Sequence, residues 1–255
     1  MYLGFPVQSI LLFLLFAFTP LFALAAEKIP QVHPFLRPNM YFGFSVIRDT
    51  AYYNFKRDET SPELNFTDFD HFDWNGKGIG GEIYLGYEKF FLTHYYLGLE
   101  GFFNCSSNEG KIYFFDSNEL YSRILKGTFK QKWQSGLAIH PGFYLPSVGI
   151  IYGRAGWIIS DINLSGSITQ TGPFGSFSGK FSNTRKKNGV QLGTGLELEL
   201  TKNWRCRFEW DWNRLQDFIF DSQGKDSNNH RYQTTRIAKH PILEQFKLGL
   251  NWRFS

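Results

Sequence analysis

Apolar and polar residues alternate with a period of two in eight segments of the chain between residues 40 and 254. Because successive side chains of a β-strand point to opposite faces, this period predicts strands rather than helices. The first predicted strand covers residues 40–53 and the last covers residues 246–254. A strand like the last one needs an apolar environment on one side and a polar one on the other. Its apolar face carries Phe246, Leu248, Leu250, Trp252 and Phe254, and its polar face carries Lys247, Gly249, Asn251 and Arg253.

The seventh predicted strand, residues 204–213, shows which face meets which environment. Its apolar face includes three tryptophans, Trp204, Trp210 and Trp212. If the apolar face meets a lipid bilayer, a shift by one residue would instead expose Arg205 and Arg207 to lipid. Near the midplane of the bilayer this costs roughly 2–4 kcal/mol for each arginine. The pattern therefore specifies the register of this strand strongly.

The connections between the predicted strands alternate in length. Three are short and four are long, polar and rich in Gly, Ser, Asn and Asp. Bacterial membrane barrels have short periplasmic turns and long extracellular loops, and a soluble β-sandwich does not produce this alternation. The sequence therefore predicts an all-β fold, an eight-stranded antiparallel up-and-down transmembrane β-barrel. The short connections are residues 89–94, 145–148 and 201–203, and the long ones are residues 56–76, 106–127, 164–187 and 215–242.

Composition agrees with a barrel and excludes several other classes. Aromatic residues make up 19% of the chain, yet the mean hydropathy of −0.29 is too polar for a helical membrane protein. Both values suit a barrel, in which only one face of each strand meets lipid. The net charge of +4 indicates no nucleic-acid partner, and two cysteines are too few for a disulfide framework.

The N-terminal segment is predicted to be a signal peptide, residues 1–25. It is rich in Leu and Phe, lacks charged side chains, and ends in small residues at Ala23 and Ala25. A retained membrane anchor is the alternative, and no other run is long enough for a transmembrane helix. Residues 26–39, with three prolines, are predicted to be a periplasmic lead, and residues 40–255 the barrel.

Four segments resemble the small outer-membrane β-barrel family that includes opacity-type and OmpA-like barrels. They are YYLGLEG at 95–101, IYGRAGW at 151–157, NWRCRFEW at 203–210 and KLGLNWRF at 247–254. The resemblance covers about residues 40–254 and implies export to the bacterial outer membrane. The last segment looks like the assembly signal of such proteins, with Lys247, Gly249, Trp252 and Phe254 at its defining positions. This implies the barrel assembly machinery as a partner, although Ser255 follows the final aromatic residue.

Charged residues on the faces opposite to the apolar ones are predicted to form a network inside the barrel. An eight-stranded barrel has an interior that side chains fill, and unpaired charges there are costly. Equal numbers of acids and bases therefore indicate a plug of ion pairs, with a narrow gated pore as the alternative. The acids are Glu82, Glu100, Glu197, Glu199, Glu209 and Asp211, and the bases are Lys132, Arg154, Arg205, Arg207, Lys247 and Arg253.

Other chemistry receives weaker support from the sequence. None of the six histidines has a recognisable catalytic partner motif, so no catalytic, cofactor-binding or metal residue is predicted. Asp68, Asp70, His71 and Asp73 have a spacing that suits a divalent cation, but solvated acidic side chains in a loop have the same pattern. The basic run 185–187 is suited to lipopolysaccharide phosphates, or to a rim at the membrane surface. The histidines are His33, His71, His94, His140, His230 and His240.

These observations predict a monomeric outer-membrane protein with a structural or surface-binding role, adhesin-like or opacity-like, exerted through its long extracellular loops. Outer-membrane lipid and lipopolysaccharide are the expected surroundings, and no cofactor or nucleic acid is expected. The alternatives are a narrow pore through the charged lumen and a lipid-modifying outer-membrane enzyme. The sequence does not identify a surface ligand.

Overall fold

The computed structural model describes residues 39–61, 66–91, 94–117, 122–146, 148–172, 175–225 and 231–254. Side chains within residues 55–74 and 220–240 lie outside this description. The predicted signal peptide and nearly all of the predicted lead also lie outside the described residues. Among the described residues, no helix is long and apolar enough to cross a membrane.

Ten strands make up almost all of the described chain. Their order in the sequence is β1 (Asn39–Ser61), β2 (Phe66–Phe91), β3 (Tyr95–Ser106), β4 (Glu109–Ser117), β5 (Ser122–Leu145), β6 (Gly149–Gly172), β7 (Gly175–Glu199), β8 (Trp204–Leu215), β9 (Phe218–Lys225) and β10 (Arg231–Arg253).

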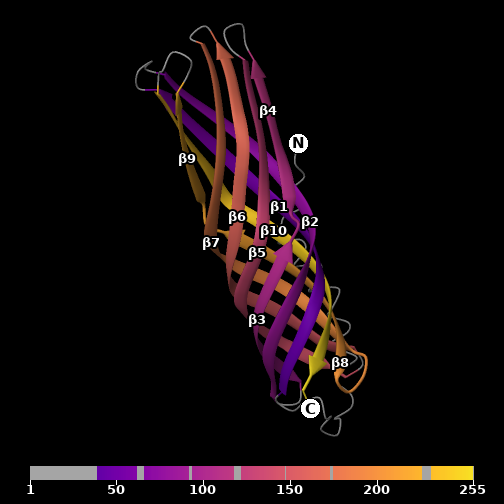
Figure 1. Ribbon diagram of the computed structural model, residues 1–255. Coiled ribbons are helices and arrows are strands. Elements are labelled where there is room, and N and C mark those ends of the chain that lie inside the picture. Colours follow the sequence, from indigo (N-terminus) through magenta and orange to yellow (C-terminus); the bar gives the residue numbers. More distant parts are fainter. Residues whose placement is uncertain are drawn as a thin grey trace.

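Eight of these strands close into a ring in which every neighbour is antiparallel. The order around the ring is β1-β10-β8-β7-β6-β5-β3-β2, and β2 pairs with β1 to complete it. β4 and β9 continue β3 and β8 after breaks of two residues, at 107–108 and 216–217. Figure 1 shows the resulting tilted barrel. The prediction of an eight-stranded antiparallel barrel is therefore confirmed.

The long connections are largely strands rather than loops, which corrects the expectation from their polar composition. The β6–β7 hairpin, for example, remains paired from Ile150–Glu197 up to Gly172–Gly175. β1 and β2 likewise remain paired up to Ser61 and Phe66. Backbone pairing satisfies the amide groups of these segments even where their side chains are polar. The barrel therefore continues on one side as a tall extension.

The extension consists of two separate sheets. One has the order β2-β1-β10-β9 and the other the order β4-β5-β6-β7. Between β2 and β4, the described strands pair only at Lys77 and Glu109. In Figure 1 the upper ends of β1, β2, β9 and β10 gather on one side, and those of β4 to β7 gather on the other.

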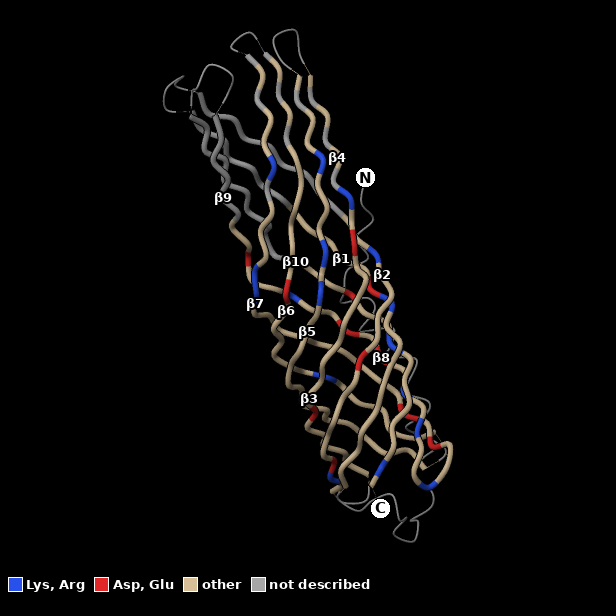
Figure 2. Tube along the Cα trace, in the orientation of Figure 1, with Lys and Arg blue, Asp and Glu red and all other residues tan. Residues whose placement is uncertain are grey.

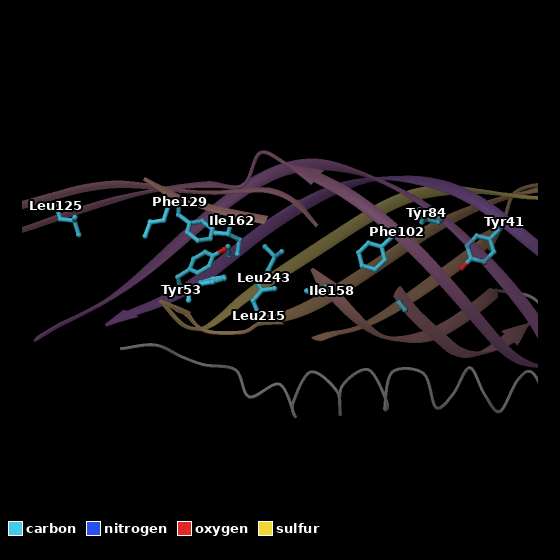
Figure 3. Packing of buried hydrophobic residues seen from close by; sticks show 14 residues of the cluster. Tyr41, Tyr53, Tyr84, Phe102, Leu125, Phe129, Ile158, Ile162, Leu215 and Leu243 are labelled. Atoms are coloured by element: carbon cyan, nitrogen blue, oxygen red, sulfur yellow. The ribbon is translucent and has the colours of Figure 1, made fainter. Parts of the chain in front are cut away.

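The distribution of polarity reverses between the ring and the extension. In the ring, the outward side chains are apolar and the inward ones polar, as in the exposed Leu99 and the buried Glu100 of β3. In the extension, the buried inward side chains that the structure describes are mostly apolar. Figure 3 shows this inner cluster, which lies at a distance from Tyr41 and Tyr84 of the ring. It includes Tyr53, Phe129, Ile162, Leu215 and Leu243, all buried.

A β-bulge in β5 marks this transition and corrects one prediction. The pairing of β5 with β6 shifts between Gln131 and Trp133, so that Gln131 and Gln134 are both buried. A bulge places two residues opposite one and changes which positions face inward. Lys132, predicted to face the lumen, lies at this bulge and is exposed on the outer surface. The prediction for Lys132 was wrong because strict alternation does not continue through a bulge.

Aromatic side chains line the outer surface of the barrel at the end where the short turns lie. Tyr95 packs on Phe143 with ring centroids 5.2 Å apart, and Trp204 stacks on Trp252 at 5.9 Å. Such belts are typical of the interface between membrane and water. The predicted assembly signal lies here: Trp252 and Phe254 are exposed and stacked, whereas Lys247 and Gly249 face inward. Whether these residues guide assembly stays a prediction.

Candidate functional site

The lumen of the ring contains ten of the twelve side chains that were predicted to form a charge network. Glu199 is half-buried near the short-turn end, and Lys132 lies outside. The ten buried side chains come from six strands: Glu82 (β2), Glu100 (β3), Arg154 (β6), Glu197 (β7), Arg205, Arg207, Glu209 and Asp211 (β8), and Lys247 and Arg253 (β10).

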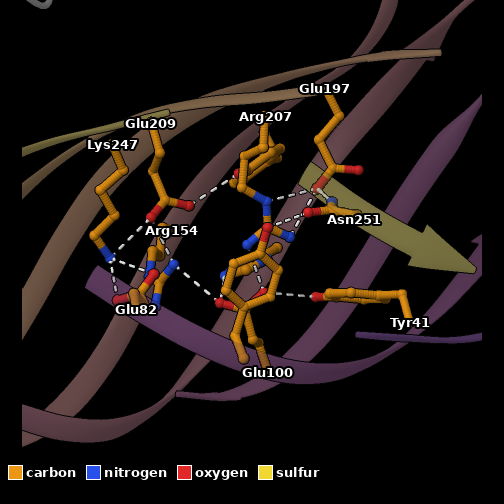
Figure 4. Close-up of polar contacts among 12 residues, drawn as sticks. Tyr41, Glu82, Glu100, Arg154, Glu197, Arg207, Glu209, Lys247 and Asn251 are labelled. Carbon is orange, nitrogen blue, oxygen red and sulfur yellow. Dashed lines mark hydrogen bonds and ion pairs between the residues drawn. The ribbon is translucent and has the colours of Figure 1, made fainter. Parts of the chain in front are cut away.

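Arg207 is the centre of this network. Its guanidinium lies 2.6 Å from the Glu100 carboxylate and 2.7 Å from that of Glu197. It also packs over the ring of Tyr84, 4.2 Å from the ring centroid. Figure 4 shows Arg207 between the two carboxylates. Several hydrogen bonds to charged groups thus fix one side chain, which is the condition for burying a charge without a large net cost.

A second group lies nearer to the extension. Arg154 lies 2.6 Å from Glu209 and 3.0 Å from Glu100, which connects this group to Arg207. The Lys247 ammonium lies 2.7 Å from Glu82 and 2.8 Å from Asp211. The ion pairs therefore form one continuous network across the lumen.

Glu88 belongs to this network, although the prediction did not include it. Its carboxylate lies 2.8 Å from Arg205 and 2.6 Å from Arg253, near the short-turn end of the lumen. The alternation of β2 already placed Glu88 on the inward face, and this was the signal that would have identified it. Asp49 of β1 is also buried on the inward face.

The predicted equality of acids and bases does not hold, because Lys132 is outside and both Glu88 and Asp49 are inside. Neutral hydroxyl groups donate hydrogen bonds to carboxylates of the network, in addition to the bases. Tyr41 donates to Glu100 at 3.0 Å, and Tyr152 donates to Glu209 at 2.9 Å. Hydrogen bonds to a carboxylate stabilise its charge, so tyrosines and amides take part of the role that was assigned to bases alone.

A chain of side-chain amides crosses the lumen between the charges and the extension. Gln131 donates to Gln134, Gln134 to Asn213, Asn213 to Gln245, and Gln245 to the carboxylate of Asp49. The four bonds are between 3.0 and 3.3 Å long. These residues come from β5, β8, β10 and β1, so the amides connect opposite walls of the barrel.

Glycines on the inner wall make space for the lumen tyrosines. Gly195 is paired directly with Tyr152, and Gly86 with Tyr41. A Cβ atom on either glycine would collide with the ring of the paired tyrosine. Each ring therefore lies across a glycine of the next strand, which is how aromatic side chains protect glycines in sheets.

Apolar layers close the polar lumen on both sides. Toward the extension lies the inner cluster described above, in which the rings of Tyr53 and Phe129 have centroids 4.0 Å apart. Toward the short turns, Phe90 packs against Tyr96 and Tyr144, and Ile150 is buried beside them. Buried side chains thus lie along the interior of the ring from the short turns to the base of the extension.

His140 is the histidine with the most defined surroundings, and it lies inside this closed region. Its Nε2 is 3.9 Å from the Glu100 carboxylate, and its ring stacks on Tyr152 with centroids 4.9 Å apart. His94 lies on a short turn. The side chains of His33, His71, His230 and His240 lie outside the described residues. A substrate from solution would have to displace a packed layer to reach His140.

Residues 12–254 match the family described as the outer membrane protein β-barrel domain. The chain belongs to this family. It is therefore a β-barrel protein of the bacterial outer membrane, and the resemblance noted in its sequence is confirmed. No curated protein matches the chain.

Solved barrels resemble the chain at low sequence identity. Ail, the attachment invasion locus protein of Yersinia pestis, is 13% identical, with a TM-score of 0.34, covering 82% of this chain and 98% of Ail. Neisserial surface protein A is 15% identical, with a TM-score of 0.35, covering 83% and 97%. OprG of Pseudomonas aeruginosa is 10% identical, with a TM-score of 0.38, covering 83% and 95%.

In outer-membrane barrels the short turns are periplasmic, so the extension of this barrel lies outside the cell. The outward face of its β4-β5-β6-β7 sheet is basic. Figure 2 shows blue positions along the upper parts of β5 and β7. The exposed basic residues on this face are Lys111 of β4, Lys126, Lys130 and Lys132 of β5, and Lys180 and Lys186 of β7.

A groove of about 510 Å³ lies on this basic face. Tyr113, Lys126, Ser167 and Lys180 pair with one another in a single row across the four strands. The short side chains of β6 form the floor, and the longer lysine and tyrosine side chains of the flanking strands form the walls. The lining residues are Lys111, Tyr113, Lys126, Gly127, Thr128, Ser165, Gly166, Ser167 and Lys180.

No group of three or more His, Cys, Asp or Glu side chains with the arrangement of a metal site occurs among the described side chains. The acidic cluster at Asp68, Asp70, His71 and Asp73 is paired with β1 through its backbone. Its side chains lie outside the described part, so the cation hypothesis stays a prediction.

Proposed function

We propose that this protein is a non-conducting outer-membrane barrel that binds an anionic saccharide on the outside of the cell. The groove on the basic face of the extension is the observation that carries this proposal. The proposal refines the surface-binding role expected from the sequence. It assigns the contacts to strands of the extension instead of loops.

The chemistry of the groove suits a sugar that carries sulfate or phosphate. Lys126 and Lys180 are ammonium groups on opposite sides of a floor with hydroxyl groups from Ser165 and Ser167. Hydroxyl groups exchange hydrogen bonds with sugar hydroxyls, and ammonium groups bind sulfate or phosphate oxygens. Lys126 lies over the ring of Tyr113, 5.9 Å from its centroid, and that exposed ring offers an apolar surface to a sugar.

The position of the groove favours a ligand beyond the lipid headgroups. Lys126 precedes Trp133, a residue at the upper border of the apolar belt, by seven positions along β5. This corresponds to roughly 23 Å of strand at about 3.3 Å per residue. Lys132 and Lys186 are closer to that border and are better placed for phosphates of the surrounding lipopolysaccharide.

The contents of the lumen support a non-conducting barrel. Water and ions would have to pass the apolar layer around Phe129, the network around Arg207, and the aromatic layer around Tyr96. The same layers weigh against the alternative of a narrow pore. The absence of catalytic activity stays a prediction.

The groove is tested by comparing two double variants that remove the same charge from the same sheet. Lys126→Gln with Lys180→Gln changes the groove, and Lys132→Gln with Lys186→Gln changes the rim. Each protein in lipid nanodiscs is titrated with fluorescent dextran sulfate, with phosphorylated core oligosaccharide from lipopolysaccharide, and with neutral dextran. We expect the groove variant to lose at least about tenfold in affinity for one anionic saccharide, which corresponds to ~1.4 kcal/mol.

The rim variant, Lys132→Gln with Lys186→Gln, is the control and should lose much less affinity for that saccharide. Neutral dextran should not bind. Equal losses for the two variants would mean that only the total charge matters, and the proposed site would be wrong. A preference for the core oligosaccharide would identify the ligand as membrane lipopolysaccharide, and a preference for dextran sulfate a soluble polymer. Steady single-channel currents of the wild type in planar bilayers would contradict the closed lumen.

A further inference from the structure

The outer margin of β4 is an open strand edge. Every residue of β4 pairs with β5 on one side, from Glu109–Lys130 to Ser117–Ser122. On the other side, the described strands offer a single partner, Lys77 opposite Glu109. Beyond that point, β2 follows β1 into the other sheet (Figure 1). On this side, the backbone donors and acceptors of every second residue between 112 and 117 therefore have no partner among the described strands.

Beyond Lys111, the described side chains of this edge lack the features that protect strand edges against pairing with other chains. Natural edges carry lysines, prolines or bulges. Tyr113 and Phe115 alternate on the outward face of β4, and their side chains are 67% and 55% exposed. The described sequence of β4 contains no proline, and its pairing with β5 is uninterrupted.

The opposite margin of the same sheet provides a contrast. Residues 175–188 of β7 pair with β6 and, among the described strands, with no second strand. Their exposed outward side chains are short and polar or basic, such as Ser178, Lys180 and Lys186. The two edges of this sheet thus differ: exposed lysines and short polar side chains protect β7 along its length, whereas β4 beyond Lys111 exposes the aromatic side chains of Tyr113 and Phe115.

We propose that β4 binds an extended segment of another polypeptide, which adds to the sheet as an antiparallel strand. Backbone hydrogen bonds hold such a strand, and alternate side chains provide its specificity. The side chains beside Tyr113 and Phe115 would be aromatic or β-branched. A carboxylate would lie toward Lys111, on a face that also carries Lys126 and Lys130. The partner segment therefore carries aromatic or β-branched side chains and a carboxylate on the same face, at every second position.

Chain direction argues against pairing between the β4 edges of two copies in the same membrane. β3 leaves the periplasmic turn at His94, and β4 continues in the same direction away from the membrane. Two barrels in one membrane both present a rising β4, so these two edges cannot lie antiparallel. An independent extended segment is free to run toward the membrane.

The experiment uses a fluorescent peptide of about eight residues, a common strand length. Valines followed by a glutamate occupy every second position, so that they share one face, and threonines fill the positions between them. Anisotropy measures its binding to the full chain in nanodiscs, and ¹³C-carbonyl infrared spectra report whether it joins a sheet. Two further peptides are N-methylated at every second backbone amide, one at the odd positions and the other at the even positions. We expect the unmodified peptide to bind with a sheet signature, and one N-methylated peptide to lose binding.

Phe115→Lys introduces a protective lysine on β4, and Ser178→Lys makes the same charge change on β7. We expect Phe115→Lys to weaken peptide binding by at least about tenfold, and Ser178→Lys to leave it within about twofold of wild type. Equal binding of all three peptides, or equal effects of the two variants, would overturn the proposal.

A second copy is the remaining occupant to be tested. If the wild type forms dimers in the absence of peptide and the Phe115→Lys variant is monomeric, the edge serves self-association and the peptide proposal is overturned. The site shares Lys111 and Tyr113 with the saccharide groove, whereas Phe115 does not line the groove. Dextran sulfate affinity that is unchanged or raised in Phe115→Lys shows that the extension remains folded while the edge is blocked.

Discussion

The guanidinium of Arg207 lies 2.6 Å from the carboxylate of Glu100, although the two residues stand on opposite walls of the barrel. Arg207 is on β8 and Glu100 is on β3, four positions away in the ring of eight strands. Both side chains are fully buried. This ion pair therefore crosses the lumen and fixes the distance between two walls that share no backbone hydrogen bonds.

Replacing Arg207 should destabilise the barrel strongly. Arg207→Leu leaves the carboxylates of Glu100 and Glu197 without their main partner, and breaking a buried pair in this way costs about 3–5 kcal/mol. Urea unfolding in lipid vesicles, followed by tryptophan fluorescence, measures the change. Lys132→Leu removes the same charge on the exposed bulge and should shift the unfolding free energy by no more than about 0.5 kcal/mol. Similar shifts for the two variants would mean that the lumen network contributes little.

Adding one methyl group to a glycine on the inner wall should also destabilise the barrel. In Gly195→Ala the new Cβ collides with the ring of Tyr152, which is itself hydrogen-bonded to Glu209. Overpacking of this kind costs about 1–3 kcal/mol. Gly153→Ala is the matched control, because the nearest atoms to its Cβ are 4.0 Å away. The same unfolding assay should show a loss for Gly195→Ala alone, and equal stability of the two variants would contradict the tyrosine packing.

Strict alternation and the lengths of the connections were sufficient to predict the ring, the inward and outward faces of its strands and most of the inward charges. It failed at Lys132, because the bulge between Gln131 and Trp133 is a property of the pairing with β6 rather than of β5 alone. Glu88 has the correct face in the sequence, but its two arginine partners come from β8 and β10. Which inward acids acquire ion pairs depends on tertiary distances, and a strand pattern does not contain these.

The extension was mistaken for loops because its composition is the reverse of the ring's. Ser, Thr, Gly and Lys on its outward face resemble a solvated loop, as at Ser178 and Lys180. Its inward apolar residues, such as Phe129 and Ile162, are buried only because the two sheets of the extension face each other. The groove and the open edge of β4 both depend on this arrangement, so neither was predictable from local alternation.

Assembly should depend on the last aromatic residue. The backbone amide of Phe254 donates to the carbonyl of Met40 at 3.0 Å, and its ring stacks on Trp252, with centroids 5.8 Å apart. The resemblance to a barrel assembly signal predicts that Phe254→Ala lowers the folded, heat-modifiable fraction in the outer membrane. Phe246→Ala removes an exposed ring from the same face of β10 and should assemble normally. An undiminished yield of Phe254→Ala would exclude the proposed signal.

The two cysteines provide a test of topology, because they point outward from opposite walls. Cys105 is exposed on β3, opposite Trp133 near the extracellular border, and Cys206 is half-exposed on β8, close to the periplasmic turn at 201–203. A disulfide requires Cα atoms within about 7 Å, whereas the apolar belt that separates these residues is ~25 Å tall. Both should therefore remain free thiols despite the oxidising periplasm. On intact cells an impermeant maleimide should label Cys105, whereas lipid protects Cys206, and both should react after denaturation. A Cys105–Cys206 disulfide found by mass spectrometry in the native protein would contradict the strand order on which the other predictions rest.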